Sequence, residues 1–161
     1  MAISAAPKNS RNGTLTLTNS ARTWTLLYTD GDFSVSGLQE GQKNVEAVQN
    51  RGDHHALIYT NQTYPEVSFS GTWTDISDGT EVNALDIVTK IGSCAGDDGS
   101  ISSQSPYAVD LLWTVEGTDM GDPSDHSLAL ADCRLTMNGT EGMPTNTFSI
   151  SGTCYGTVTA T

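Results

Sequence analysis

Residues 66–74, with the sequence Glu-Val-Ser-Phe-Ser-Gly-Thr-Trp-Thr, decide the fold class of this chain. Apolar or small side chains there alternate with hydroxyl side chains: Val67, Phe69, Gly71 and Trp73 alternate with Ser68, Ser70, Thr72 and Thr74. A period of two residues belongs to a β-strand, because successive side chains point to opposite faces of the sheet. The stretch therefore predicts a strand with one buried face and one exposed face.

The same alternation recurs along most of the chain, and it gives the other expected strands. Their exposed faces carry Ser and Thr and almost no Lys. Sheets that face water usually carry charged residues, Lys above all, which discourage pairing with other chains. A smooth hydroxyl-rich face therefore favours repeated contact with copies of the same chain. The further strands are expected at residues 13–18, 23–29, 33–36, 109–115, 128–137 and 148–158. A short strand is also expected at residues 45–48, and residues 56–59 form another short apolar run.

The spacing of these segments predicts the architecture. Residues 13–36 are expected to form a three-stranded meander with turns at Asn19-Ser20 and Asp30-Gly31, the second being a strong hairpin signal. Strands, one helix and further strands follow one another, without a βαβ pattern. The fold class expected is mainly β, an antiparallel β-sandwich or half-barrel with one flanking helix, built as a single domain over residues 1–161. Residues 1–12 are small and polar, which indicates a loose N-terminal arm.

One segment, at about residues 79–91, predicts the flanking α-helix. Val82, Leu85, Val88 and Ile91 recur at every third position, with Ala84 and Ile87 beside them. This spacing is typical of an amphipathic helix. Asp78 and Glu81 suit its N-terminus, and Lys90 and Gly92 suit its end. The apolar side of the helix is expected to cover one open side of the sheets.

The charge of the chain excludes one large class of functions. Its 161 residues include 7 Lys and Arg against 19 Asp and Glu, a net charge of −12. Proteins that grip nucleic acid need the opposite balance to neutralise phosphates. The sequence also has no run of 18 apolar residues and no apolar segment at its start that would suit a signal peptide.

No catalytic or metal-binding motif is found. The sequence contains no phosphate-binding glycine loop, no Walker pattern and no nucleophile elbow. His54 and His55 are adjacent, so on a strand they point to opposite faces and do not share one ion. The acidic clusters around Asp97 and Asp122 lack the ligand order of a calcium loop. We therefore expect no catalytic residues, no metal and no cofactor, and the chain is not expected to be an enzyme.

Two of the three cysteines stand in a symmetric setting. Cys133 and Cys154 flank the turn-rich stretch 138–144 almost evenly, so a hairpin closed there brings them together on neighbouring strands. Two interpretations stay open: a pair of small buried apolar residues, or a cross-strand disulfide. Either way, thiols in strand interiors are usually inert.

Taken together, the layout resembles a tail tube protein of a long-tailed, siphovirus-like bacteriophage. The likeness rests on the early hairpin at residues 30–38, the stretch ending in 50–53, the strand at 65–70, the helix after it and the closing pair 130–134 and 146–152. It implies six copies per ring, with the sheets of neighbours joined into one wall around a lumen. It also implies rings stacked head to tail, usually through a long loop.

This resemblance sets the functional expectation. An acidic wall does not hold phosphates, so DNA would pass through the tube without specific binding. The partners implied are other copies of the chain, a tape measure protein and tail-end proteins, in a virion tail assembled in the host cytoplasm. The loop from residue 51 to 64 is the proposed ring-stacking contact, since Arg and aromatic residues are typical interface anchors. The residues chosen there are Arg51, Asp53, His54, His55, Tyr59 and Tyr64.

Two other classes of function stay open at this stage. The chain fits another virion component, such as a head decoration protein or a spike domain. It also fits a secreted β-sandwich binding or adhesin module, which would need an exposed aromatic platform.

Overall fold

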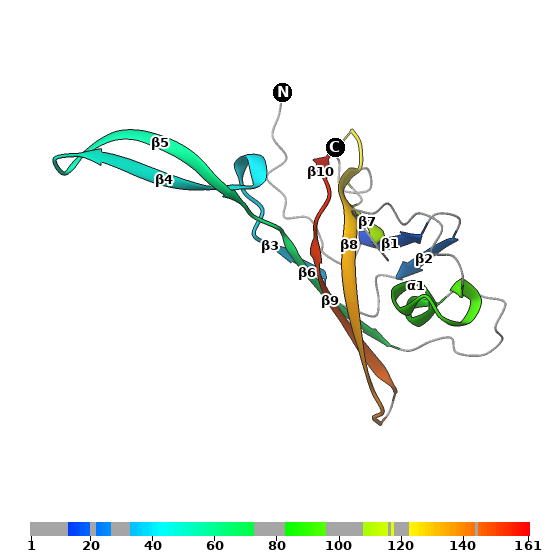
Figure 1. Ribbon diagram of the computed structural model, residues 1–161. Helices are drawn as coiled ribbons and strands as arrows, with labels where there is room; N and C mark the ends of the chain where they lie inside the picture. The colour runs from blue at the N-terminus through cyan, green and yellow to red at the C-terminus, as the bar shows by residue number, and fades with distance from the viewer. Residues whose placement is uncertain are drawn as a thin grey trace.

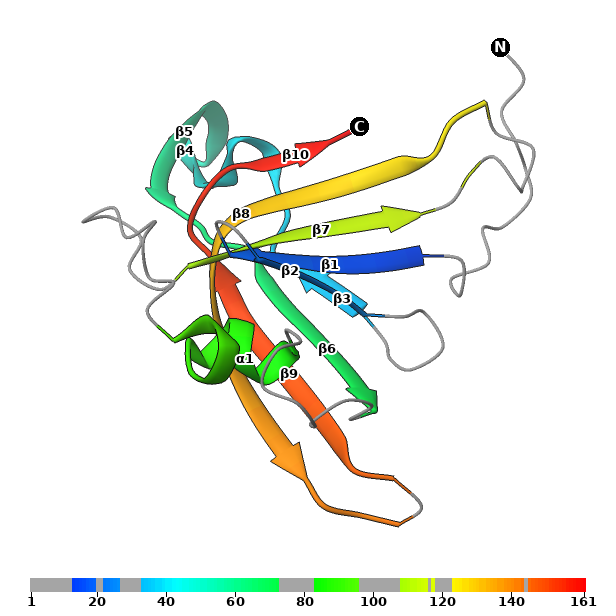
Figure 2. The ribbon, with the colours of Figure 1, turned by 90° about the vertical axis from the view of Figure 1, so that its right-hand side faces the viewer.

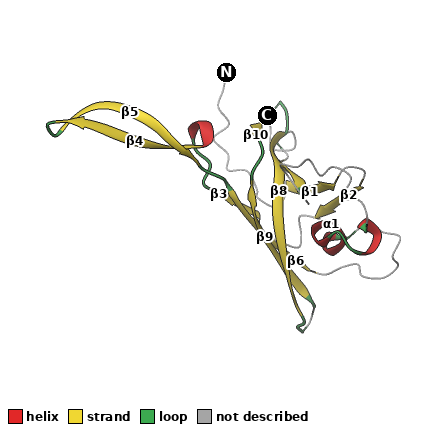
Figure 3. Ribbon diagram, viewed as in Figure 1, coloured by secondary structure: helices red, strands yellow, loops and turns green. Residues whose placement is uncertain are grey.

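The computed structural model describes residues 13–19, 22–26, 33–72, 83–95, 108–115, 117, 123–143 and 145–161. This part of the chain is mainly β, with antiparallel strand pairing throughout and a single short α-helix (Figures 1 and 3). The strands are β1 (Gly13–Asn19), β2 (Arg22–Leu26), β3 (Phe33–Ser36), β4 (Lys43–Asn50), β5 (Asp53–Gln62), β6 (Glu66–Thr72), β7 (Val109–Val115), β8 (His126–Thr140), β9 (Thr147–Cys154) and β10 (Val158–Ala160). The helix is α1 (Ala84–Thr89), and 3₁₀ turns lie at Glu40–Gln42 and Gly92–Cys94.

The main sheet has the strand order β2-β1-β7-β8-β9-β6-β3, with β10 paired to β8. The first half of β8 lies between β7 and β10, and its second half pairs with β9. Figure 2 shows the two groups of strands crossing each other, with α1 beside the crossing. The sheet is thus bent over itself into a half-barrel, as two sheets do when strands pass from one to the other at a corner.

The apolar face of the half-barrel forms the core. Leu17, Leu111, Leu130 and Ile150 are fully buried there, together with Ile87 of the helix. Burial of one such side chain contributes about 1.5–3 kcal/mol. The alternation expected at 66–72 is confirmed, because Val67, Phe69 and Gly71 are buried while Ser68 and Ser70 between them are exposed. The interior of this face therefore supplies the main stabilisation of the body.

Two tryptophans pack against the core, namely Trp24 and Trp113, both half-buried. Trp113 lies against Phe33 with ring centroids 5.2 Å apart, and Trp24 lies against Phe148 at 6.1 Å. Trp73 lies outside the described residues. The tryptophans that can be placed therefore contribute to packing.

The helix is confirmed, but its bounds and buried face differ from the expectation. Asn83 caps its start by accepting a hydrogen bond from the Asp86 backbone N–H at 3.0 Å. Lys90, with φ 58°, ends it in the left-handed conformation. Ile91 therefore lies beyond the helix and is 53% exposed, so its expected place in the core was wrong. Ala84 and Ile87 are buried instead, and the caps expected at Asp78 and Glu81 lie outside the described residues.

The expected three-stranded meander was wrong in its last step. β1 does pair with β2, but β3 pairs with β6 at the other end of the strand order, with Phe33 opposite Phe69. A turn signal such as Asp30-Gly31 acts locally, whereas strand pairing is decided by which apolar faces meet in the core. The turn itself, Ser20 and the N-terminal residues 1–12 lie outside the described residues.

The hairpin of β8 and β9 confirms the expectation for the closing strands. Its register runs from Cys133 opposite Cys154 to Thr140 opposite Thr147. The last expected strand, 148–158, is interrupted at residues 155–157, where the chain turns and β10 pairs with β8 instead.

Candidate functional site

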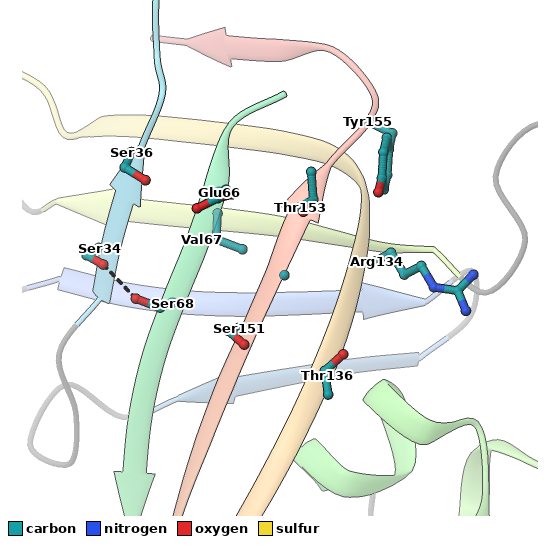
Figure 4. Close-up of a pocket in the computed structure, with 11 residues that line it drawn as sticks. Ser34, Ser36, Glu66, Val67, Ser68, Arg134, Thr136, Ser151, Thr153 and Tyr155 are labelled. Atoms are coloured by element: carbon teal, nitrogen blue, oxygen red, sulfur yellow. Dashed lines mark hydrogen bonds between the residues drawn. The ribbon is translucent and has the colours of Figure 1, made fainter. Parts of the chain in front are cut away.

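The exposed face of strands β3, β6, β9 and β8 carries mainly Ser and Thr side chains, and we call it the hydroxyl face. Because residues in register share a face, the pairing places Ser34, Ser68, Ser151 and Thr136 in one row across the four strands. The hydroxyls of Ser34 and Ser68 hydrogen-bond to each other at 2.7 Å. Figure 4 shows this row on the open face of the sheet.

The neighbouring rows have the same character, with few charges. One row contains Ser70, Ser149 and Asn138, and the other contains Ser36, Glu66, Thr153 and Arg134. Glu66 and Arg134 are the charged side chains of these rows, and the strand of Thr153 lies between them. The described rows are therefore mainly neutral and rich in hydroxyls.

A shallow groove of about 480 Å³ follows the row of Ser68 and the row of Glu66, and Tyr155 is among its lining residues. The Tyr155 ring lies against Tyr64, with centroids 5.0 Å apart, and both side chains are exposed. Gly152 lines the groove where β9 and β8 approach closely, since a Cβ there would lie 2.2 Å from the Arg134 carbonyl oxygen. The groove offers hydrogen-bonding hydroxyls, one carboxylate and one guanidinium among its lining residues, without the paired carboxylates that glycoside hydrolysis uses.

The second candidate surface is the hairpin of β4 and β5, which we call the arm (residues 43–62). It forms a separate two-stranded sheet that projects from the body (Figure 1). Its two-residue turn, Arg51-Gly52, has φ values of 54° and 94°, as a turn with two left-handed residues requires. The expectation of a loop from residue 51 to 64 was therefore wrong over most of its length, because residues 53–62 form a strand.

The arm has large apolar side chains that no other described part of the chain covers. Leu57 is 63% exposed and Tyr59 is 59% exposed, and Val45, Val48 and Ile58 are exposed as well. Register places Val45 beside Tyr59 and Ala47 beside Leu57, so these four share one side of the arm. An isolated two-stranded hairpin is at best marginally stable in water. An apolar surface of this kind marks a site of contact with another molecule.

The residues chosen for self-assembly fall in two places. Arg51 lies in the turn at the tip of the arm, and Asp53, His54 and His55 begin the strand after it. Tyr59 lies midway along the arm. Tyr64 lies after β5, against Tyr155 of the body, and is not part of the arm.

The residues chosen for self-assembly did not include the apolar residues of the arm, above all Val45, Val48, Leu57 and Ile58. A signal for them was present, since two apolar runs flank Arg51-Gly52 at similar distances on either side. Such a two-residue turn between apolar runs is typical of a hairpin.

Cys133 and Cys154 lie opposite each other where β8 bends, and both are fully buried thiols. The Cys154 thiol donates to the Ala131 carbonyl oxygen at 3.1 Å, an oxygen that also accepts from the Gly156 N–H. A hydrogen bond with the Cys154 side chain, and then burial, raise the pKa of the Cys133 thiol above its usual range. The pair thus belongs to the packing of the corner, where a thiolate is disfavoured at Cys133.

The bend itself is made by Asp132, which has φ 53°. The register between β7 and β8 shifts at this point, as in a β-bulge. The Asp132 N–H donates to the Asp110 carboxylate at 2.9 Å, and the Asp132 carbonyl accepts from the Tyr155 N–H. These hydrogen bonds fix the angle between the hydroxyl face and the rest of the half-barrel.

Two general features of the described residues complete the picture. They include no group of three or more His, Cys, Asp or Glu side chains placed to hold a metal ion. Nor does the described part contain a helix with the length and hydrophobicity needed to span a membrane.

Comparison with known proteins shows the fold. No protein-family model matches the chain, and no curated protein matches it. Among solved structures, the tube-terminating cap of the anti-feeding prophage aligns with a TM-score of 0.55 and 13% identity over 100% of this chain and 94% of that chain. The sheath/tube terminator of the PVC extracellular contractile injection system, in the extended state, aligns at 0.60 and 10% identity over 99% of both chains. A chain of the sheath–tube complex of the same system aligns at 0.59 and 10% identity over 98% of this chain and 93% of that chain. At such identities the likeness shows that this chain has the fold found in tube, terminator and cap assemblies of phage-tail-like contractile systems.

Proposed function

We propose that this chain is a structural, non-enzymatic subunit of a phage-tail-like tube, and that its copies assemble into stacked hexameric rings around a hollow lumen. The observation that carries the proposal is the arm, an apolar hairpin without a core of its own. The fold of the three assembly proteins supports it. Because those systems are contractile, the likeness favours a phage-tail-like particle without favouring the siphovirus type expected from the sequence.

The hydroxyl face is the surface that we assign to the lumen. Within the described residues, β3 pairs on one side only, with β6, and the second half of β8 pairs only with β9. Open strand edges with few charges are hazards for a monomer but suitable joints between identical subunits. Joining the β3 edge of one copy to the β8 edge of the next would continue the hydroxyl rows around a ring.

Such a wall would let a nucleic acid pass without holding it. Duplex DNA carries one charge per ~1.7 Å of its axis, so adhesion needs cations on the wall. The described rows offer Arg134 as their cation, with Glu66 in the same row, and every copy brings a net charge of −12. The lining that we propose is thus hydroxyl-rich with an acidic background, and the DNA meets it without specific binding.

The arm is the contact that we assign to ring stacking, with Arg51, Asp53, His54, His55 and Tyr59 on it. Burial of its apolar side against the next ring would contribute about 25 cal/mol per Å² of apolar surface. Further partners in this proposal are a tape measure protein and tail-end proteins. The location proposed is the tail of a virion or a related particle, assembled in the host cytoplasm.

The direct test is electron microscopy of the purified protein at rising concentration. We expect hollow rods or stacked rings, with six subunits visible in end views. Protein that stays monomeric at every concentration would contradict the proposal. A variant with residues 44–61 replaced by a short Gly-Ser linker is expected to give folded monomers or single rings. The matched control, Met143→Ser at the fully exposed tip of the β8–β9 hairpin, is expected to assemble like the parent.

One observation favours a second candidate, a carbohydrate-binding module. Tyr155 of the exposed Tyr64–Tyr155 pair lines the hydroxyl groove, and exposed aromatic rings are typical anchors for sugars and other ligands. The rings are tilted by 55°, however, and do not form one flat platform. Binding of oligosaccharides to a monomeric protein, lost in Tyr155→Ala, would support this candidate over the tube.

A further inference from the structure

The inner, apolar face of the half-barrel continues beyond the core at one end of the sheet. Register places Trp113, Leu128 and Ala160 in one row across β7, β8 and β10, and Val115 lies opposite His126 in the next row. These residues line an open groove of about 390 Å³ whose surface is mostly apolar. Its volume lies within the range of about 300–1,000 Å³ that is usual for ligand-binding pockets.

A strand edge runs beside this groove. β10 pairs with β8 and, within the described part of the chain, with no other strand. The Ser127 N–H donates to Thr161 and the Thr161 N–H donates back, which extends the ladder to residue 161. The groove therefore offers an apolar floor and, at its border, backbone groups that an added strand can pair with.

The arm has an apolar side and an extended backbone, which match the apolar floor of the groove and the strand edge beside it. Its side with Val45, Ala47, Leu57 and Tyr59 is apolar, and its backbone is already extended. Its charged residues balance, with Lys43 and Arg51 against Glu46 and Asp53, so the net charge of −12 belongs to the rest of the chain. Copies with that charge repel each other, and a neutral apolar segment can approach an acidic body without adding to the repulsion.

We propose that the groove of β7, β8 and β10 receives the arm of a second copy of this chain. This inference rests on the proposed function, and it names the surface that the arm contacts. In Figure 1 the arm projects to the left of the body, whereas the C-terminal residue 161, which lines the groove, lies at the top of the body, so the arm and the groove of one chain lie apart. A contact between two different surfaces of identical subunits is heterologous, and such contacts build rings or filaments.

Cysteine cross-linking between two differently tagged chains tests the contact. One chain carries Leu57→Cys in the arm and the other carries Ala160→Cys in the groove, so that a disulfide between them forms only between molecules. The control partner carries Thr159→Cys, which is the next residue of β10 and points to the opposite face. All three positions are exposed, whereas the native cysteines are buried. We expect about 10-fold more cross-linked dimer with the Ala160→Cys partner than with the Thr159→Cys partner, since a held contact raises the effective concentration.

A charge placed in the groove gives an independent readout. Ala160→Asp is expected to raise the protein concentration needed for assembly about 10-fold or more, whereas Thr159→Asp leaves it near that of the parent. The circular dichroism of both variants as monomers should match the parent.

The outcomes separate the two proposals. Rods or rings with equal cross-linking for the Thr159→Cys and Ala160→Cys partners would overturn the groove contact and leave the tube function standing. Protein that never assembles, with no cross-link at any concentration, would overturn both. Normal assembly of Ala160→Asp would also overturn the groove contact.

Discussion

Two hairpins of this chain, the arm of β4 and β5 and the closing pair of β8 and β9, obey the same local rules and differ in what covers them. In β8 and β9, Leu135, Phe148 and Ile150 enter the core, and the serines between them face outward. In the arm, residues of equal hydrophobicity are exposed on both sides. Strand-forming residues and a two-residue turn thus make a hairpin, but only a second layer makes it part of a core. The contact that we propose for the arm with another copy of the chain would supply that second layer.

The largest contrast is expected between large-to-small changes in the two hairpins. Ile150 is 1% exposed, so Ile150→Ala should lower the free energy of unfolding by about 2–5 kcal/mol. Leu57→Ala in the arm should change it by no more than about 0.5 kcal/mol in the monomer. Urea unfolding of monomeric protein measures both. Equal losses would show that the arm packs on its own body.

A smaller contrast concerns glycine in the closing hairpin. A Cβ at Gly152 would lie 2.2 Å from the Arg134 carbonyl oxygen, so Gly152→Ala must push β9 away from β8. Such overpacking costs about 1–3 kcal/mol. Gly142→Ala, near the tip, is the control, because its nearest atom would lie at an ordinary 3.5 Å. Equal melting temperatures for the two variants would show that β9 can move away from β8 without loss of stability.

The arm can also be weakened without touching its apolar side. Gly52 has φ 94° with nothing within 4 Å of a Cβ, so Gly52→Ala brings backbone strain of roughly 1 kcal/mol and no clash. Amides of residues 43–62 should then exchange with deuterium several-fold faster, while those of β8 and β9 keep their rates. Faster exchange in both hairpins would mean that the arm and the body unfold as one unit.

The smallest expected effect concerns the buried cysteines. We propose that Cys133 and Cys154 can close into a disulfide, because directly opposite residues of antiparallel strands lie at separations that suit one. A small disulfide oxidant would take up the two thiol hydrogens as the protein S–S bond forms. Burial makes this slow, so we expect conversion over hours, detected by mass spectrometry, while Cys94 stays a thiol. In a Cys154→Ser variant, Cys133 has no partner and should stay a thiol. Loss of the Cys133 thiol in that variant at the same rate would contradict the pairing.

Much of the body could be predicted from the sequence, because its strands alternate against one core. The strand at 66–72 and the β8–β9 hairpin follow directly from that alternation. The partner of β3 could not be predicted, since Phe33 meets Phe69 through a long-range register that no local turn signal encodes. Ile91 was misplaced because a left-handed residue at Lys90 ended the helix one residue before it.

The candidate surfaces were predicted less well than the fold. The hydroxyl residues were recognised as a face, but their order in rows depends on register across four strands. The second strand of the arm was expected as a loop with Arg51, His54 and His55, whereas the most exposed apolar residue of the arm is Leu57. Exposure of an apolar residue depends on whether a layer covers it, and that depends on the whole topology.

The continuity of β8 has a mechanical consequence. This strand of 15 residues belongs to both halves of the half-barrel, and Asp132 turns it from one into the other. A force on either half is therefore transmitted along β8 as shear on the backbone hydrogen bonds of the other half. The two halves cannot rotate independently of each other. When neighbouring subunits put the body under tension, its two halves should deform together and unfold in a single cooperative step.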